Sequence, residues 1–243
     1  MVAAGTAAFV LVGSGSGGGG GGGGKSGDSG RRALTADEAN RLAITRFRNY
    51  QAGGRALTIT VPSTGGGLTV TGAVDYRAKV GYGVVRGTGR DTSSDGLIEW
   101  SSTAVLILPM TNAPATAPSS PPTSGWYRRP VTTAGSSLDS ALTIALGLGS
   151  DRPDNAELLP QNGAARLGQD EVRGHRVVVM SGPKSASAPG ASGAVRYWVG
   201  SDGTMYRVRA DLASEPQPVV VDFDTHPYVA VRPLPGVTPT PSS

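Results

Sequence analysis

Residues 57–76 read LTITVPSTGGGLTVTGAVDY. Apolar side chains alternate with threonine from Leu57 to Val61, and a similar alternation returns from Leu68 to Tyr76 after three glycines. A period of two places the apolar side chains on one face of a strand, and glycines between two such runs favour a turn. The stretch therefore predicts two antiparallel strands that share one buried face.

Similar short runs of β-forming residues lie on both sides of a segment rich in Pro, Ser and Thr at 111–124. Proline cannot donate to a sheet ladder, so this segment is expected to be a loop within the domain. The further predicted strands lie at 80–84, 97–108, 125–129, 172, 176–180, 195–199, 205–209 and 219–223. We expect about eight or nine antiparallel strands in all.

Two helices interrupt this pattern. The first is predicted over 35–51, because Thr35 and Glu38 have the spacing of a capping box and an apolar stripe of helical period follows. The second begins at Ser136 and is apolar nearly all round as far as Leu148. Such a helix is either buried in the core on most sides, which is the more usual case, or borders an apolar cavity.

Together these elements predict an α+β fold in which a curved antiparallel sheet forms a half-open β-barrel that helices close. The chain of 243 residues has enough apolar content for one sizeable core. We expect three parts: an N-terminal stub and Gly/Ser linker at 1–30, one folded domain at 31–232, and a disordered Pro/Thr/Ser tail at 233–243.

The first thirty residues place an apolar stub, Val2–Val12, before eight consecutive glycines, Gly17–Gly24. The stub is shorter than the ~20 residues that span a bilayer, and no Lys or Arg precedes it. We interpret it as the tail of an export signal or membrane anchor whose basic beginning lies further upstream. The alternative is a disordered tail that is apolar by chance.

Composition excludes several classes of function. The chain has no cysteine, hence no disulfide, thiolate zinc site, thiol nucleophile or acceptor for a lipoprotein lipid. The net charge of +4 is dispersed, which argues against a nucleic-acid partner. Residues 19–26 match a phosphate-loop pattern, but the glycine linker continues after them, so we interpret the match as an accident of polyglycine.

An enzyme would have few residues to work with, since His175 and His226 are the only histidines and no G-x-S-x-G motif exists. Asp222, Asp224 and His226 would share one face of a strand, as a metal site or an acid–base pair requires. The simpler interpretation is the solvent side of a final strand, and a turn or surface position for His175. We therefore expect no enzymatic activity, no catalytic residue, no metal and no cofactor.

The order of elements and several short motifs carry a resemblance. The motifs are Gly125–Tyr127, LGQDEVRGH at 167–175 and RYWVGSDGTMYRV at 196–208. The last of them contains a W-V-x-x-D-G hairpin. Over 33–226 the chain resembles the actinobacterial LppX/LprG lipoproteins, which are related in fold to LolA. That resemblance implies a half-open barrel that holds acylated lipids or lipoproteins in an apolar cavity. The lipid-bearing cysteine of that family is absent here, which leaves the mode of anchoring open.

The resulting hypothesis is a monomeric carrier that binds a lipid or other hydrophobic ligand in a cavity. We expect it to be extracytoplasmic, either membrane-associated or secreted, and to contact the membrane surface through its N-terminal stub. Trp126 and Trp198 could line the mouth of the cavity, but filling a core is the favoured role of both. The alternative is a ligand-free interaction or sensory domain whose interior is filled by its own side chains. The candidate lining residues are Leu57, Ile59, Val70, Val84, Leu106, Leu142, Leu146, Val178 and Trp198.

Overall fold

The computed structural model describes residues 30–63, 66–89, 94–183, 195–212, 215–223, 228 and 230–234. These residues form the helices α1 (Ala36–Gln51), α2 (Ser137–Leu146) and α3 (Leu158–Gln161). Their strands are β1 (Arg32–Ala33), β2 (Gly54–Val61), β3 (Leu68–Asp75), β4 (Val80–Gly87), β5 (Gly96–Trp100), β6 (Ala104–Pro109), β7 (Tyr127–Pro130), β8 (Ala165–Val172), β9 (His175–Ser181), β10 (Arg196–Val199), β11 (Met205–Ala210) and β12 (Val219–Phe223).

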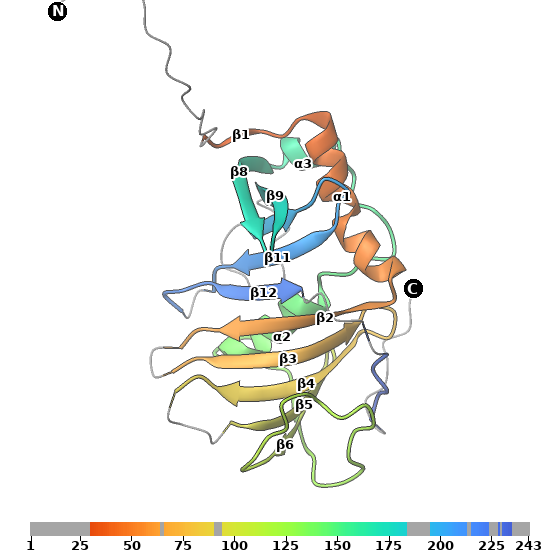
Figure 1. Ribbon diagram of the computed structural model, residues 1–243, viewed down its shortest axis with the longest axis vertical. Helices are drawn as coiled ribbons and strands as arrows, with labels where there is room; N and C mark the ends of the chain where they lie inside the picture. Colours follow the sequence, from red (N-terminus) through yellow and green to blue (C-terminus); the bar gives the residue numbers. More distant parts are fainter. Residues whose placement is uncertain are drawn as a thin grey trace, which may run out of the picture.

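All twelve of these strands belong to one antiparallel sheet, in the order β1-β8-β9-β10-β11-β12-β2-β3-β4-β5-β6-β7. The two halves of the chain meet where β12 pairs with β2, with Val221 opposite Ile59. The end strands β1 and β7 each have one partner, so the curved sheet stays open and is not closed into a barrel (Figure 1). The predicted α+β class with a curved antiparallel sheet is confirmed.

The middle of the sheet is buried on both faces. We call the face that carries Leu57, Ile59 and Val70 the inner face, and α2 packs on it across β2, β3 and β4. The opposite, outer face carries Tyr82 and Leu97 among other apolar side chains. Residues 231 and 234 and the long segment after β6 cover that outer cluster. The sheet is therefore the central layer of three.

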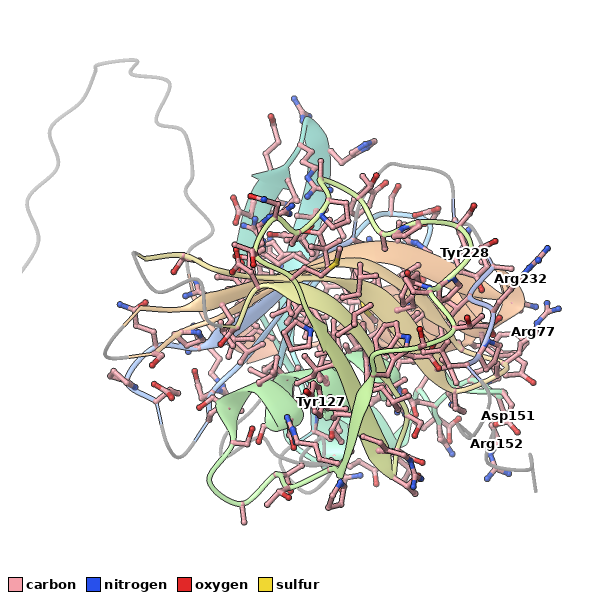
Figure 2. All side chains as sticks on the ribbon, turned by 90° about the horizontal axis from the view of Figure 1, so that it is seen from below. Arg77, Tyr127, Asp151, Arg152, Tyr228 and Arg232 are labelled. Carbon is pink, nitrogen blue, oxygen red and sulfur yellow. The ribbon has the colours of Figure 1, made fainter. Side chains whose placement is uncertain are left out.

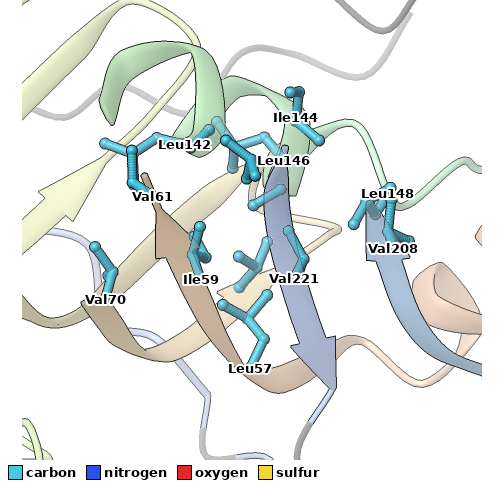
Figure 3. Close-up of a cluster of buried hydrophobic side chains, with 14 of the residues drawn as sticks. Leu57, Ile59, Val61, Val70, Leu142, Ile144, Leu146, Leu148, Val208 and Val221 are labelled. Atoms are coloured by element: carbon cyan, nitrogen blue, oxygen red, sulfur yellow. The ribbon is translucent and has the colours of Figure 1, made fainter. Parts of the chain in front are cut away.

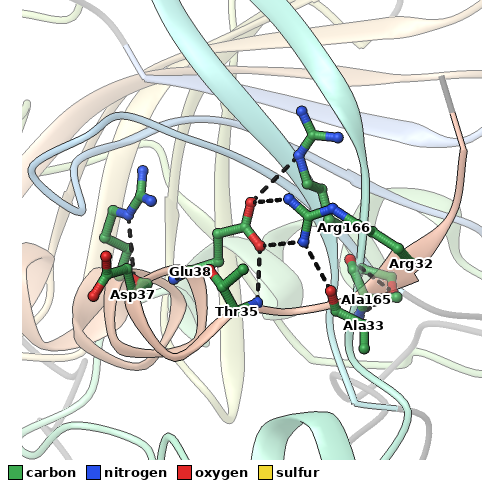
Figure 4. A network of polar contacts seen from close by, with 9 residues as sticks. Arg32, Ala33, Thr35, Asp37, Glu38, Ala165 and Arg166 are labelled. Carbon is green, nitrogen blue, oxygen red and sulfur yellow. Dashed lines mark hydrogen bonds and ion pairs between the residues drawn. The ribbon is translucent and has the colours of Figure 1, made fainter. Parts of the chain in front are cut away.

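Helix α1 begins as the sequence predicts, because the Thr35 side chain and Glu38 form a capping box. Glu38 is nearly buried, and its carboxylate also binds two arginines that lie far apart in sequence (Figure 4). Its Oε2 accepts from Arg32 Nη1 at 2.8 Å, while Oε1 lies 3.3 Å from Nε of the buried Arg166. This network fixes the start of α1 against β1 and β8.

The structure adds three elements to those predicted, namely β1, α3 and most of β8. Residues 165–172 read ARLGQDEV, in which a glycine and polar side chains interrupt any apolar alternation. The strand forms because β9 pairs with it along its length, with one register shift near Gly168. A partner that is itself a strong strand supplies the hydrogen bonds that local propensity does not predict.

Candidate ligand-binding site

The apolar helix α2 is the element that a ligand site between helix and sheet would depend on. Ser136 caps it, because its Oγ accepts from the Asp139 amide at 3.2 Å, and the helix ends at Gly147. Its apolar side chains, Leu142 and Ile144 among them, are almost entirely buried. The helix therefore depends on tertiary burial on nearly every side, as its composition predicts.

An ion pair fastens the first turn of α2 to the edge strand β7. The fully buried carboxylate of Asp139 accepts from Nη1 and Nη2 of Arg129 at 2.6 Å each, and from the Thr132 amide at 2.7 Å. Burial alone would raise the pKa of Asp139, but these hydrogen bonds and the Arg129 charge outweigh it and hold that pKa below its usual 3.8. Asp139 is therefore a structural anchor for the helix.

Five of the nine predicted lining residues come together between α2 and the inner face (Figure 3). Leu57 and Ile59 on β2 and Val70 on β3 face Leu142 and Leu146 on α2. The three strand residues are 0% exposed and the two helix residues 2% and 6%. Side chains this inaccessible have next to no water-sized space beside them, so this interior is packed by the protein itself.

The other four predicted residues lie in different clusters. Val84 and Leu106 belong to the outer face, on the far side of the sheet from α2. Val178 packs beside the cluster under α1, and Trp198 is in a small cluster with Val172 and Val177. The nine residues therefore do not surround one common space, and their role in binding a ligand stays a prediction.

Both tryptophans that the sequence singles out have a hydrogen-bonded indole. Trp198 Nε1 donates to Asp170 Oδ2 at 2.8 Å, and Trp126 Nε1 donates to the Pro122 carbonyl at 2.7 Å. The ring of Trp198 is nearly buried, and that of Trp126 is half-buried against the outer-face cluster. Both rings fill clusters, which agrees with the favoured interpretation.

A pocket of about 350 Å³ lies at the end of the sheet where α2 begins. One wall is the β2–β3 hairpin, with Val61 and Leu68, and the other is the start of α2, with Leu138. Val61 and the partly buried Leu68 and Leu138 also pack in the inner core. Three apolar residues of the pocket lining thus belong to the apolar interior, and the remaining lining consists mainly of glycine and serine.

A second pocket of about 530 Å³ lies beside the first, and Glu215 is among the residues that line both of them. Its Oε1 accepts a hydrogen bond from the Ser137 hydroxyl in the first turn of α2. A carboxylate at this position is favoured by the partial positive charge of the helix N-terminus. Sequence reasoning found the start of α2 through Ser136 but missed Glu215, which contacts the helix across 78 residues.

The residues considered for catalysis are dispersed. The Asp222 carboxylate pairs with Arg207 at 2.6 Å, and the His175 ring stacks on Tyr206 at the surface. Asp224 and His226 lie outside the described residues, as does the phosphate-loop match at 19–26. The described part of the chain holds no group of three His, Asp or Glu side chains that could bind a metal. Nor does it contain a helix with the length and apolar character needed to cross a bilayer.

Solved structures that match this one include lipoprotein LppX from Mycobacterium tuberculosis, at 12% identity and a TM-score of 0.43, with 80% of this chain and 98% of that one covered. A DUF1329 family protein from Desulfovibrio piger matches at 12% identity and a TM-score of 0.32, with 77% and 90% covered. A LolA superfamily protein from Nitrosomonas europaea matches at 12% identity and a TM-score of 0.31, with 86% and 99% covered.

No protein-family model matches the sequence, and no curated protein matches it either. The first of the solved structures is an LppX lipoprotein, from the family that the sequence resembles, and the third is a LolA superfamily protein, the group to which that family is related in fold.

Proposed function

We propose that this protein is a non-enzymatic, extracytoplasmic carrier that binds a lipid or other hydrophobic ligand between α2 and the inner face of the sheet. The observation that carries the proposal is the pocket at the start of α2, three of whose lining residues also pack in the apolar interior. A hydrophobic chain that enters there would meet Val61, Leu68 and Leu138 first. Association with the membrane through residues 1–30 is part of the same proposal.

Ligand entry requires that α2 moves away from the sheet, since the side chains beneath it are packed. The helix is suited to such a movement, because its first turn is held by polar anchors, Arg129 and Glu215, and the rest by apolar contacts. Apolar contacts are non-directional and re-form against an acyl chain at a similar free energy per unit of area. Volume would then set selectivity more than charge.

The packed interior also favours the second candidate, an interaction or sensory domain of the same fold that binds no ligand. In that case α2 stays on the sheet, and function resides on the surface. The two candidates differ in one measurable property, namely whether the interior takes up an acyl chain.

Native mass spectrometry of the secreted full chain, followed by organic extraction, tests the proposal. A carrier yields a co-purifying lipid, or takes up added acyl lipid, and loses both when Leu142 and Leu146 are changed to Trp. Leu158→Trp is the matched control, because Leu158 is 47% exposed and the added bulk stays outside the core. Circular dichroism checks that each variant folds. A bare protein mass with no uptake of acyl lipid contradicts the carrier and favours the interaction domain.

A further inference from the structure

A fully buried carboxylate lies in the outer apolar cluster. Glu99 on β5 is 0% exposed, and its neighbours across the ladder on this face are Tyr82 on β4 and Leu106 on β6. Oε1 accepts one hydrogen bond, from the Leu234 amide at 2.9 Å. Within the described structure Oε2 has no partner, and neither has the Tyr82 hydroxyl. A buried carboxylate with a single hydrogen-bond partner is costly to keep ionised.

The Leu234 amide belongs to a segment that crosses the outer face, here named the C-terminal strap and defined as residues 228 and 230–234. At one end the Tyr228 hydroxyl donates to Asp75 Oδ2 at 2.8 Å, next to β2. The Tyr228 ring lies so close to Gly54 that a Cβ there would come within 2.4 Å of it. At the other end Val231 and Leu234 are buried in the outer cluster. In Figure 2, Tyr228 and Arg232 lie on the same side of the molecule as Arg77.

Few charged groups are positioned to compensate Glu99. The elements packed against it contribute the Tyr82 hydroxyl from β4, apolar side chains from β6 and from the segment after it, and the Leu234 amide from the strap. Arg232 on the strap is exposed, and Arg86 on β4 donates to the carbonyls of residues 113 and 114. Burial raises the pKa of Glu99 to about 7, although the Leu234 amide lowers it.

We propose that the C-terminal strap is a latch that stays closed while Glu99 is protonated and is released when Glu99 ionises, which uncovers the part of the apolar outer face that lies beneath the strap. Release lets water reach the carboxylate, which is why the ionised form favours it. The uncovered surface would be the part of the cluster of Val80, Tyr82, Val84, Leu97 and Leu106 that the segment after β6 does not cover. It lies on the opposite side of the sheet from α2, so the latch is independent of the proposed carrier site.

The direction of the pH dependence follows from the two states. With the strap open, Glu99 is hydrated and has its ordinary pKa of 4.5, whereas with the strap closed the pKa is about 7. Glu99 therefore stabilises the closed state fully at pH values below 4.5, the pKa with the strap open. This stabilisation is lost as pH rises through about 7, the pKa with the strap closed. A difference of this size changes the opening equilibrium by roughly 300-fold in all, since each pKa unit corresponds to tenfold, and most of that change falls between pH 5 and pH 8.

Hydrogen exchange of the full chain, read at the amides of Val231 and Leu234 as protection factors at pH 5 and pH 8, tests the latch. We expect the protection factors of these strap amides to fall by roughly a hundredfold from pH 5 to pH 8, while that of the Ile59 amide in β2 stays unchanged. Glu99→Gln keeps the shape of the side chain and an oxygen that accepts a hydrogen bond, but the side chain cannot ionise. Protection of the strap amides should therefore become independent of pH. Glu171→Gln, at an exposed position on β8, is the matched control and behaves as the unchanged chain.

Equal strap protection at the two pH values, or the same pH dependence in Glu99→Gln as in the unchanged chain, overturns the proposal. If Glu99→Gln fails to fold, the carboxyl carbon of Glu99 is followed by NMR in the unchanged protein. A titration midpoint near 7 supports the latch, and one near 4.5 overturns it.

Discussion

The ion pair between Asp139 and Arg129 makes the sharpest prediction, because it fastens the first turn of α2 to β7. Asp139→Asn removes the negative charge. It also replaces one carboxylate oxygen, which accepts from a guanidinium nitrogen of Arg129 at 2.6 Å, by an NH₂ group that cannot accept that hydrogen bond. Breaking a buried ion pair from one side costs about 3–5 kcal/mol when both partners are buried. The Arg129 side chain is 38% exposed and can be rehydrated, so we expect a loss of about 2–3 kcal/mol in the free energy of unfolding.

Urea unfolding at pH 7, followed by tryptophan fluorescence and circular dichroism, measures this loss. Asp151→Asn is the matched control at an exposed position, with an expected change within about 0.5 kcal/mol. The pKa of Asp139 is lowered by the fold, so its contribution is present above the ordinary value of 3.8 and is lost as pH falls below it. The difference in stability between the variant and the unchanged chain should therefore become smaller as pH falls from 7 to 3. A loss below about 1 kcal/mol, or one of equal size at pH 3 and pH 7, refutes the reasoning.

Two further predictions concern the inner core. Leu142→Ala should lower the free energy of unfolding by about 2–5 kcal/mol, while Leu158→Ala at the exposed position changes it by less than about 0.5 kcal/mol; equal losses would contradict the packing described above. Gly81→Ala places a Cβ 2.1 Å from the Trp100 ring, so it should cost about 1–3 kcal/mol by overpacking. Adding Trp100→Leu to Gly81→Ala should remove that particular penalty, which a double-mutant cycle measures; strict additivity would show that the two sites do not clash.

Local sequence was sufficient wherever one residue pattern recurs along one element. The capping box of Thr35 and Glu38 predicted where α1 begins, and alternation predicted β2 and β3. Both signals arise within a few residues of the element itself, so no tertiary partner is needed to recognise them. The segment 165–172 shows the opposite case, because its hydrogen bonds come from β9 and its own side chains carry little alternation.

The candidate site was harder to predict, for a reason visible in β4 and β6. Val84 and Val85 are adjacent apolar residues, and so are Val105 and Leu106. Both faces of these strands are buried, so apolar and polar residues do not alternate along them. The sequence therefore does not indicate which of two adjacent apolar residues faces α2. Val84 and Leu106, which we predicted from the sequence as lining residues, face outward, whereas Val85 and Val105 face the inner core.

The amino-acid sequence alone thus determined the strands with clear alternation, both long helices and the α+β class, because propensity and periodicity act over short distances along the chain. The tertiary structure decided which face of each buried strand meets α2, the contact of Glu215 with the helix, and the position of Glu99 beneath the strap. These depend on residues that lie 78 and 135 positions apart in the chain. Contacts over such separations are set by how the whole sheet folds and packs, and no local pattern encodes them.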